Sequence, residues 1–170
     1  AWAYRRADGI ITLSRDMQEA LTGEGGRVIE VIPPWTYADD LRAVPEEENA
    51  FLREHPELTG LFRVVYAGNI GQMQNVEIVL DAAEHLRERV DICFVVVGGG
   101  ARAETLRQKA EDMGLSNVRF YPMQSADRAV DVYSMAHVNL ITLAPGVTRT
   151  AFPSKTAICC AVARPILTSV

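Results

Sequence analysis

Residues 92–100 read Ile-Cys-Phe-Val-Val-Val-Gly-Gly-Gly, a continuously apolar run of strand length that ends in three glycines. A strand without polar alternation is typical of a parallel strand buried on both faces. The segments on either side, residues 75–90 and 102–113, repeat their apolar residues at helical spacing. This stretch therefore predicts one unit of a parallel sheet that is covered by helices.

The alternation of strand and helix continues toward both ends of the chain. The expected strands cover residues 9–14, 27–33, 62–67, 92–97, 117–121, 138–143 and 165–169. The expected helices cover residues 15–23, 46–55, 75–90, 102–113, 125–136 and 154–162. Asn75 and Ser154 are the expected N-caps of their helices, and Gly114 is an expected C-terminal glycine. The order predicts an α/β fold with a Rossmann-like, doubly wound parallel sheet. Residues 34–45 are expected to form a loop, and residues 33–45 are the candidate domain boundary.

The composition excludes several classes of protein. The chain has 170 residues, 48% of them hydrophobic and 23% charged, with a net charge of −5. These values are ordinary for a globular domain, and an acidic balance disfavours nucleic acid as a partner. No apolar run reaches the roughly 18 residues of a membrane span. The three cysteines form no C-x-x-C pair and are interpreted as reduced, buried thiols, and the scattered histidines predict no metal site.

Charge is distributed unevenly along the chain. Residues 134–170 contain no Asp or Glu and carry three cations, Arg149, Lys155 and Arg164. Lys155 follows Ser154 in the first turn of a predicted helix, where a cation opposes the helix dipole. A bound anion would explain this lysine, with Arg149 reaching the same place from the preceding loop. The alternatives are a solvated lysine and chance at such small counts.

Two loops that follow predicted strands are rich in glycine. They are residues 68–74, Gly-Asn-Ile-Gly-Gln-Met-Gln, and residues 98–100. Ligands of open parallel sheets bind at the carboxyl ends of strands, and glycine lets the backbone approach them closely. Neither loop has the dinucleotide fingerprint or the P-loop spacing, which argues against an NAD enzyme. Plain turns remain the alternative, and no hydrolase triad can be assembled from the serines.

Several short segments occur in a recognisable order. They are residues 7–14 (ADGIITLS), 31–33 (VIP), 66–71 (YAGNIG) with Gln74, 97–98 (VG), 117–120 (NVRF), 153–155 (PSK) with Ala161, and 164–165 (RP). The ordered set resembles the family-4 glycosyltransferases of the GT-B fold, and within them the bacterial branch that transfers amino sugars in surface-polysaccharide synthesis. The resemblance implies a parent enzyme of two Rossmann-like domains. Residues 1–33 would be the tail of the acceptor-side domain or a crossover segment, and residues 34–170 an incomplete donor-binding domain.

The resemblance also implies an activity. The donor would be a nucleotide-diphosphate sugar, a UDP-N-acetylamino sugar, whose sugar is transferred with retention and without a metal or other cofactor. The acceptor would be a glycan or a lipid-linked intermediate, and the enzyme would be cytoplasmic, with peripheral inner-membrane association through its missing parts. The fragment alone is expected to be inactive. The implied diphosphate-stabilising residues are Lys155 and Arg149, and the implied substrate-binding residues are Gly68, Asn69, Gly71, Gln74, Gly98, Gly99, Tyr121, Met123, Thr150, Phe152 and Ser154.

The chain departs from the family pattern at several positions. Asn69 and Gln74 replace the Arg and Lys of many members, which fits the amino-sugar branch. Thr150 and Ile158 stand where the family carries a Glu-x7-Glu pair, and Ile158 cannot accept a hydrogen bond from a ribose diol. Ala163 stands where glycine is usual. Two alternatives therefore remain: a catalytically degenerate nucleotide-sugar binding or scaffold domain, and a sugar-nucleotide epimerase of the same fold.

Overall fold

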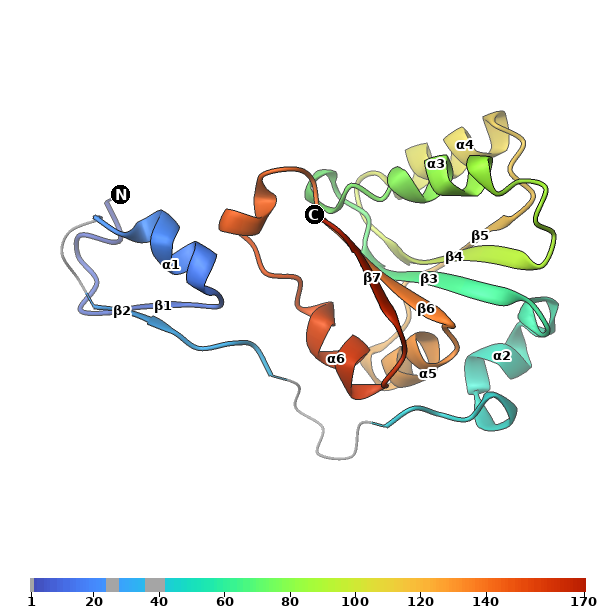
Figure 1. The fold of residues 1–170 in the computed structure, drawn as a ribbon, viewed down its shortest axis with the longest axis horizontal. Helices are drawn as coiled ribbons and strands as arrows, with labels where there is room; N and C mark the ends of the chain where they lie inside the picture. The colour runs from blue at the N-terminus through green and yellow to red at the C-terminus, as the bar shows by residue number, and fades with distance from the viewer. Residues whose placement is uncertain (1, 24–27, 36–41) are drawn as a thin grey trace.

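A computed structural model describes residues 2–23, 28–35 and 42–170 of the chain. Arg27, the expected start of the second strand, and residues 36–41 of the loop expected at 34–45 lie outside the described residues. The large sheet has five strands, β3 (Phe62–Asn69), β4 (Ile92–Gly99), β5 (Val118–Tyr121), β6 (Val138–Thr142) and β7 (Ile166–Ser169). All of its neighbouring strands pair in parallel, in the order β5-β4-β3-β6-β7 (Figure 1). The predicted parallel α/β fold is confirmed.

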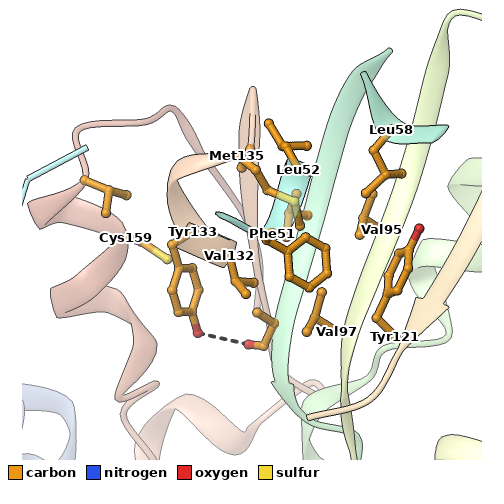
Figure 2. Close-up of a cluster of buried hydrophobic side chains, with 14 of the residues drawn as sticks. Phe51, Leu52, Leu58, Val95, Val97, Tyr121, Val132, Tyr133, Met135 and Cys159 are labelled. Atoms are coloured by element: carbon orange, nitrogen blue, oxygen red, sulfur yellow. Dashed lines mark hydrogen bonds between the residues drawn. The ribbon is translucent and has the colours of Figure 1, made fainter. Parts of the chain in front are cut away.

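Helices cover both faces of this sheet (Figure 1). On one face lie α3 (Ile78–His85) and α4 (Ala103–Asp112), and on the other lie α2 (Ala50–Glu54), α5 (Ala129–Ser134) and α6 (Lys155–Ala161). Side chains alternate along β3, so Val65 and Ala67 join one core cluster and Tyr66 joins the other. Figure 2 shows the first cluster, in which Phe51, Val132 and Cys159 come from the three helices of that face.

The N-terminal residues form a second, smaller unit. Its elements are β1 (Ile10–Thr12), α1 (Arg15–Leu21) and β2 (Ile29–Val31), and β1 pairs in parallel with β2 in a two-stranded sheet of its own. Its helix α1 lies next to the short 3-10 turn η5 (Val147–Arg149), which precedes α6 (Figure 1). Its assignment to an acceptor-side domain stays a prediction. No helix within the described ranges is long and apolar enough to cross a membrane.

The strand order reverses between β3 and β6. After β3 the chain adds β4 and β5 on one side of it, and then returns to add β6 and β7 on the other. The pairing of β3 with β6 runs over Val64–Val138 and Val65–Asn139, while β3 continues to Asn69. Such a reversal opens a crevice at the carboxyl ends of the two strands, where ligands of this class of sheet bind.

Four local expectations are wrong. The helix expected at 75–90 begins at Ile78, because Asn75 has a left-handed φ of 47° and does not cap it. Val90 lies beyond the helix and is 87% exposed. Ser154 precedes α6 as expected, but its backbone is already helical and its side chain makes no capping hydrogen bond. Cys93 and Cys159 are buried as expected, whereas Cys160 is exposed.

Ala163 follows the end of α6 in a left-handed conformation, with a φ of 50°. This conformation costs an alanine roughly 1–2 kcal/mol and suits glycine. We therefore expect Ala163→Gly to raise the free energy of unfolding by about 1 kcal/mol. The strain relieved in the folded state exceeds the entropic cost of ordering a glycine, which is more flexible than alanine in the unfolded chain. Thermal unfolding should show a Tm roughly 2–4 °C higher. A lower Tm would contradict this account of the helix end.

Candidate anion-binding site

The crevice at the strand reversal holds a cavity of about 410 Å³. Its walls come from the carboxyl ends of β3 and β6, from α5, and from the loop that leads into α6. The lining residues are Tyr66, Ala67, Gly68, Asn69, Gln74, Ala129, Tyr133, Thr142, Leu143, Ala151, Phe152, Pro153, Ser154, Lys155 and Ile158. Lys155 is the one charged residue among these described lining residues, so the cavity contains a cation and no carboxylate.

The ammonium group of Lys155 is shielded from solvent. Its Nζ atom is buried, and no hydrogen-bond partner for it lies among the described residues. It lies 3.6 Å from the centroid of the Tyr66 ring. Loss of hydration lowers the pKa of Lys155 to about 8. The lysine is therefore not the solvated one of the alternative interpretation, and a buried cation without a partner is suited to bind an anion.

The loop after β3 is tied to the neighbouring strand. The hydroxyl of Thr142 donates to the carbonyl of Gln74 at 2.5 Å, and the backbone N–H of Ala144 donates to the carbonyl of Met73 at 2.8 Å. Within the loop, the Asn69 amide donates to Oε1 of Gln74 at 3.3 Å. These contacts hold two neutral amide side chains at the edge of the cavity.

The opposite wall of the cavity is mostly apolar. Ala129 and Ile158 line it, and the hydroxyl of Tyr133 donates to the carbonyl of Ala67 at 3.2 Å (Figure 2). Burial raises the pKa of Tyr133 well above its usual range, so its hydroxyl stays neutral. A second cavity of about 100 Å³, with Met123 in its lining, shares Ala67, Gly68, Ala129 and Tyr133 with the first.

Many of the residues expected at the site meet in these cavities. The large cavity brings together Gly68, Asn69, Gln74, Phe152, Ser154 and Lys155, and the small one adds Met123. Tertiary structure thus places residues of the β3 loop beside residues that are 78 to 87 positions later in the chain. Their roles toward a substrate stay predictions.

Other expected site residues lie elsewhere in the described structure. Arg149 and Thr150 are exposed and line neither cavity. Tyr121 belongs to the core, where its ring packs edge-on against Phe51 and its hydroxyl donates to Glu57 at 2.8 Å.

The three remaining glycines differ in their surroundings. A Cβ on Gly98 would overlap the carbonyl oxygen of Gly68, and one on Gly71 would lie 2.7 Å from Oε1 of Gln74. Gly99 has open space around its Cβ position. Close packing of the two strand backbones therefore explains Gly98 without a ligand, whereas the atoms near Gly71 are the ends of flexible side chains, which can move.

Three polar residues of the cavity were not among the expected ones. Tyr66 stands in the quoted 66–71 segment, Thr142 ends a strand beside β3, and Tyr133 is a buried residue of α5. A polar residue at the carboxyl end of a predicted parallel strand was a usable signal for Thr142. The ring of Tyr66 gave no such signal, because its contact with Lys155 depends on the path of the chain between them. Within the described ranges, no group of three His, Cys, Asp or Glu side chains could hold a metal ion.

Two curated relatives share most of this chain. WcaI of Escherichia coli (strain K12), named as a colanic acid biosynthesis glycosyl transferase, is 30% identical over 151 residues, which are 87% of this chain and 37% of WcaI. WbjE of Pseudomonas aeruginosa, named as a glycosyltransferase, is 26% identical over 170 residues, which are 98% of this chain and 42% of WbjE. The chain thus spans about two fifths of the length of these relatives.

The fold and the family agree with these matches. The crystal structure of HepE of Anabaena in complex with UDP-glucose has a TM-score of 0.80 at 19% identity, over 98% of this chain and 46% of HepE. A likeness at this identity confirms the GT-B-type fold alone. The family model of the glycosyl transferases group 1 matches residues 48–145, more than half of the chain. The resemblance to glycosyltransferases of the GT-B fold is confirmed, and the chain belongs to the group 1 glycosyl transferases.

Proposed function

We propose that this chain binds the nucleotide-diphosphate part of a sugar donor, and that the protein it belongs to transfers the sugar to a glycan or lipid-linked acceptor. The transfer would retain the configuration of the sugar and serve bacterial surface-polysaccharide synthesis in the cytoplasm, at the inner membrane face. Residues 34–170 would be the donor-binding domain and residues 1–33 part of the acceptor side.

The observation that carries the proposal is the buried ammonium group of Lys155 in a cavity without carboxylates. A cation held in a low-dielectric crevice interacts strongly with phosphate oxygens, because little water screens the attraction. Transfer of the sugar leaves negative charge on the departing diphosphate. Lys155 can stabilise this charge without moving, which lowers the barrier to breaking the bond between sugar and phosphate.

Two further observations support the class of donor. HepE, which shares the fold, was crystallised with UDP and glucose and with UDP-glucose. In this chain the amide side chains of Asn69 and Gln74 line the cavity, and amides can donate to and accept from an N-acetyl group. These amides support a UDP-N-acetylamino sugar as the donor.

We also propose that transfer needs no metal or cofactor. The positive charge that the diphosphate requires is supplied by Lys155, which is part of the chain. We expect UDP to bind equally well with a chelator and with added Mg²⁺. A strong requirement for Mg²⁺ would contradict this part of the proposal.

A second candidate function rests on Ile158. This residue lines the cavity and packs against the first core cluster, so its side chain offers no acceptor for a ribose diol. A chain of this kind could bind nucleotide sugars without catalysis. Turnover of UDP-N-acetylglucosamine by the whole protein would exclude the second candidate, and nucleotide-sugar binding without any transfer would favour it.

Calorimetric titration of the 170-residue chain tests the donor site directly. We expect UDP to bind more tightly than UMP, and UMP more tightly than uridine, because each phosphate adds charge next to Lys155. UDP-N-acetylglucosamine should bind more tightly than UDP-glucose, because the side-chain amides of Asn69 and Gln74 would form hydrogen bonds with the N-acetyl group. Equal affinity for UDP and uridine would contradict the anion site.

Affinity for UDP should fall as the pH rises from 7 to about 9.5. The pKa of Lys155 in the free chain is lowered to about 8, so the ammonium loses its proton above that pH. A bound diphosphate favours the charged form of Lys155 and therefore raises its pKa. Above pH 8, binding of UDP is thus coupled to the uptake of a proton by Lys155, and the affinity for UDP falls as the pH rises. The terminal phosphate has a second pKa of about 6, so little of its ionisation remains above pH 7, and that remainder would strengthen binding as the pH rises. Lys155→Arg keeps its charge and should remove the pH dependence; the same slope in that variant would assign it to another group.

A further inference from the structure

The side chain of Lys155 lies in a slot built by two residues of β3. Tyr66 and Gly68 are two positions apart on a strand, so both face the same side of it. The ammonium lies 3.6 Å from the centroid of the Tyr66 ring. On the Gly68 side, an added Cβ would lie 3.1 Å from Nζ and 3.3 Å from Cε of Lys155. Glycine at this position, with its φ of 135°, leaves the room that the lysine occupies.

This slot connects the two faces of the sheet. The helix that carries Lys155 packs on one face through Cys159, whereas Tyr66 belongs to the core cluster of the other face. The lysine therefore reaches between the diverging ends of β3 and β6. A flexible side chain of four methylene groups keeps such a position only where its surroundings favour it.

Tyr66 also contacts the loop at the edge of the cavity. It is fully buried, and its hydroxyl donates to the carbonyl of Asn69 at 2.6 Å. The Asn69 amide in turn donates to Gln74. One aromatic residue thus contacts both the cation and the loop that carries the neutral amides.

We propose that Tyr66 is a positioning residue for donor binding: the face of its ring holds the ammonium of Lys155 at the cavity, and its hydroxyl fixes the loop that follows β3. The inference rests on the proposed function, because the ammonium is positioned for a diphosphate. The attraction of a cation to an aromatic face strengthens when both are removed from water, as they are here.

Few other ionisable groups face this ammonium. Cys159 lies one turn later on α6, and burial raises the pKa of its thiol to about 11, so the thiol is uncharged at neutral pH. Tyr133 on α5 is neutral for the same reason, and so is Tyr66 itself. The described cavity lining adds no carboxylate, guanidinium or imidazole. The ring of Tyr66 is therefore the main group near the ammonium that stabilises its charge.

The chain offers a direct test, because Lys109 and Lys155 are its only lysines. NMR titration of the chain with ¹³C-labelled lysine side chains should give two signals, and the exposed Lys109 on α4 is the internal reference. Tyr66→Leu keeps an apolar side chain and removes the ring, and should lower the pKa of Lys155 by about one unit. Tyr66→Phe keeps the ring and should leave that pKa within about 0.3 units of the parent.

The pH profile of UDP binding provides a second readout. The midpoint of its decline should move to lower pH by about one unit in Tyr66→Leu and stay in place in Tyr66→Phe. An unchanged Lys155 pKa in Tyr66→Leu would overturn the positioning role, and so would equal shifts in both variants. If UDP fails to bind the parent chain, the proposed function fails, whereas the NMR titration still decides the contact between ring and ammonium.

Discussion

Replacing Lys155 with methionine is expected to raise the Kd for UDP roughly 10- to 150-fold, which corresponds to the about 1.5–3 kcal/mol of a hydrogen bond to a charged group. Methionine fills similar space in the slot between Tyr66 and Gly68 but carries no charge. The effect should be large because Lys155 is the one charged residue among the described residues of the cavity lining. Titration calorimetry at pH 7 measures it, since the lysine is mostly protonated there.

The matched control is Lys109→Met, which removes the other lysine of the chain. Lys109 is exposed on α4 and lines neither cavity, so its variant should bind UDP as the parent does. Lys155→Met should also be at least as stable as the parent, because burying an unpaired cation costs free energy. If Lys155→Met is stable but binds UDP weakly, the weak binding is due to the missing ammonium group and not to unfolding. Equal Kd values for Lys155→Met and the parent would contradict the anion site.

Gly98→Ala is expected to lower the free energy of unfolding by about 3 kcal/mol or more. Gly98 pairs with Gly68 across β3 and β4, and an added Cβ would overlap the carbonyl oxygen of Gly68. Both sides of this contact are backbone in paired strands. The overlap can be relieved only by separating the strands, which breaks hydrogen bonds between β3 and β4. Urea unfolding measures the loss.

Gly99→Ala is the matched control, because it adds the same methyl group one residue later, where no atom other than those of the adjoining residues lies within 4 Å of the added Cβ. Its stability should stay within about 1 kcal/mol of the parent. These two variants also distinguish a packing role of the glycines at residues 98–100 from a ligand-binding role. A purely ligand-binding role predicts normal stability and weak UDP binding for Gly98→Ala, and that combination would contradict the packing role argued from the structure.

Secondary structure could be predicted from the sequence where the residues within one strand or helix are sufficient to specify it. The run Ile92–Val97 is apolar on both faces, and the structure confirms it as a strand with helices on either side. Gly114 takes the expected left-handed conformation after α4, with a φ of 63°. The start of α3 was missed, because a left-handed Asn75 ends the preceding 3-10 turn and the helix begins only at Ile78. An asparagine suits either role, and its neighbours along the chain do not distinguish them.

The candidate site could be predicted only in part, because its residues come from segments that are far apart in the chain. Lys155 could be identified because a cation in the first turn of a helix opposes the helix dipole and calls for an explanation. Arg149 has the same charge and lies in the same acid-free segment, yet it is exposed and lines neither described cavity. Their positions in the sequence do not indicate which of the two side chains reaches the cavity. Which of them reaches the cavity depends on the direction in which the loop before α6 approaches the sheet.

Three properties could be predicted from the amino-acid sequence: the alternation of strands and helices, the burial of the central strands, and the presence of a cation without acidic neighbours. These properties depend on residues that are close in sequence, whose periodicity fixes which face is apolar. The contact of Lys155 with Tyr66, 89 positions earlier, could be seen only in the folded structure. That contact exists because the strand order reverses between β3 and β6, which places α6 beside the end of β3. The order of strands is set by the packing of all helices on both faces of the sheet, and no local pattern records it.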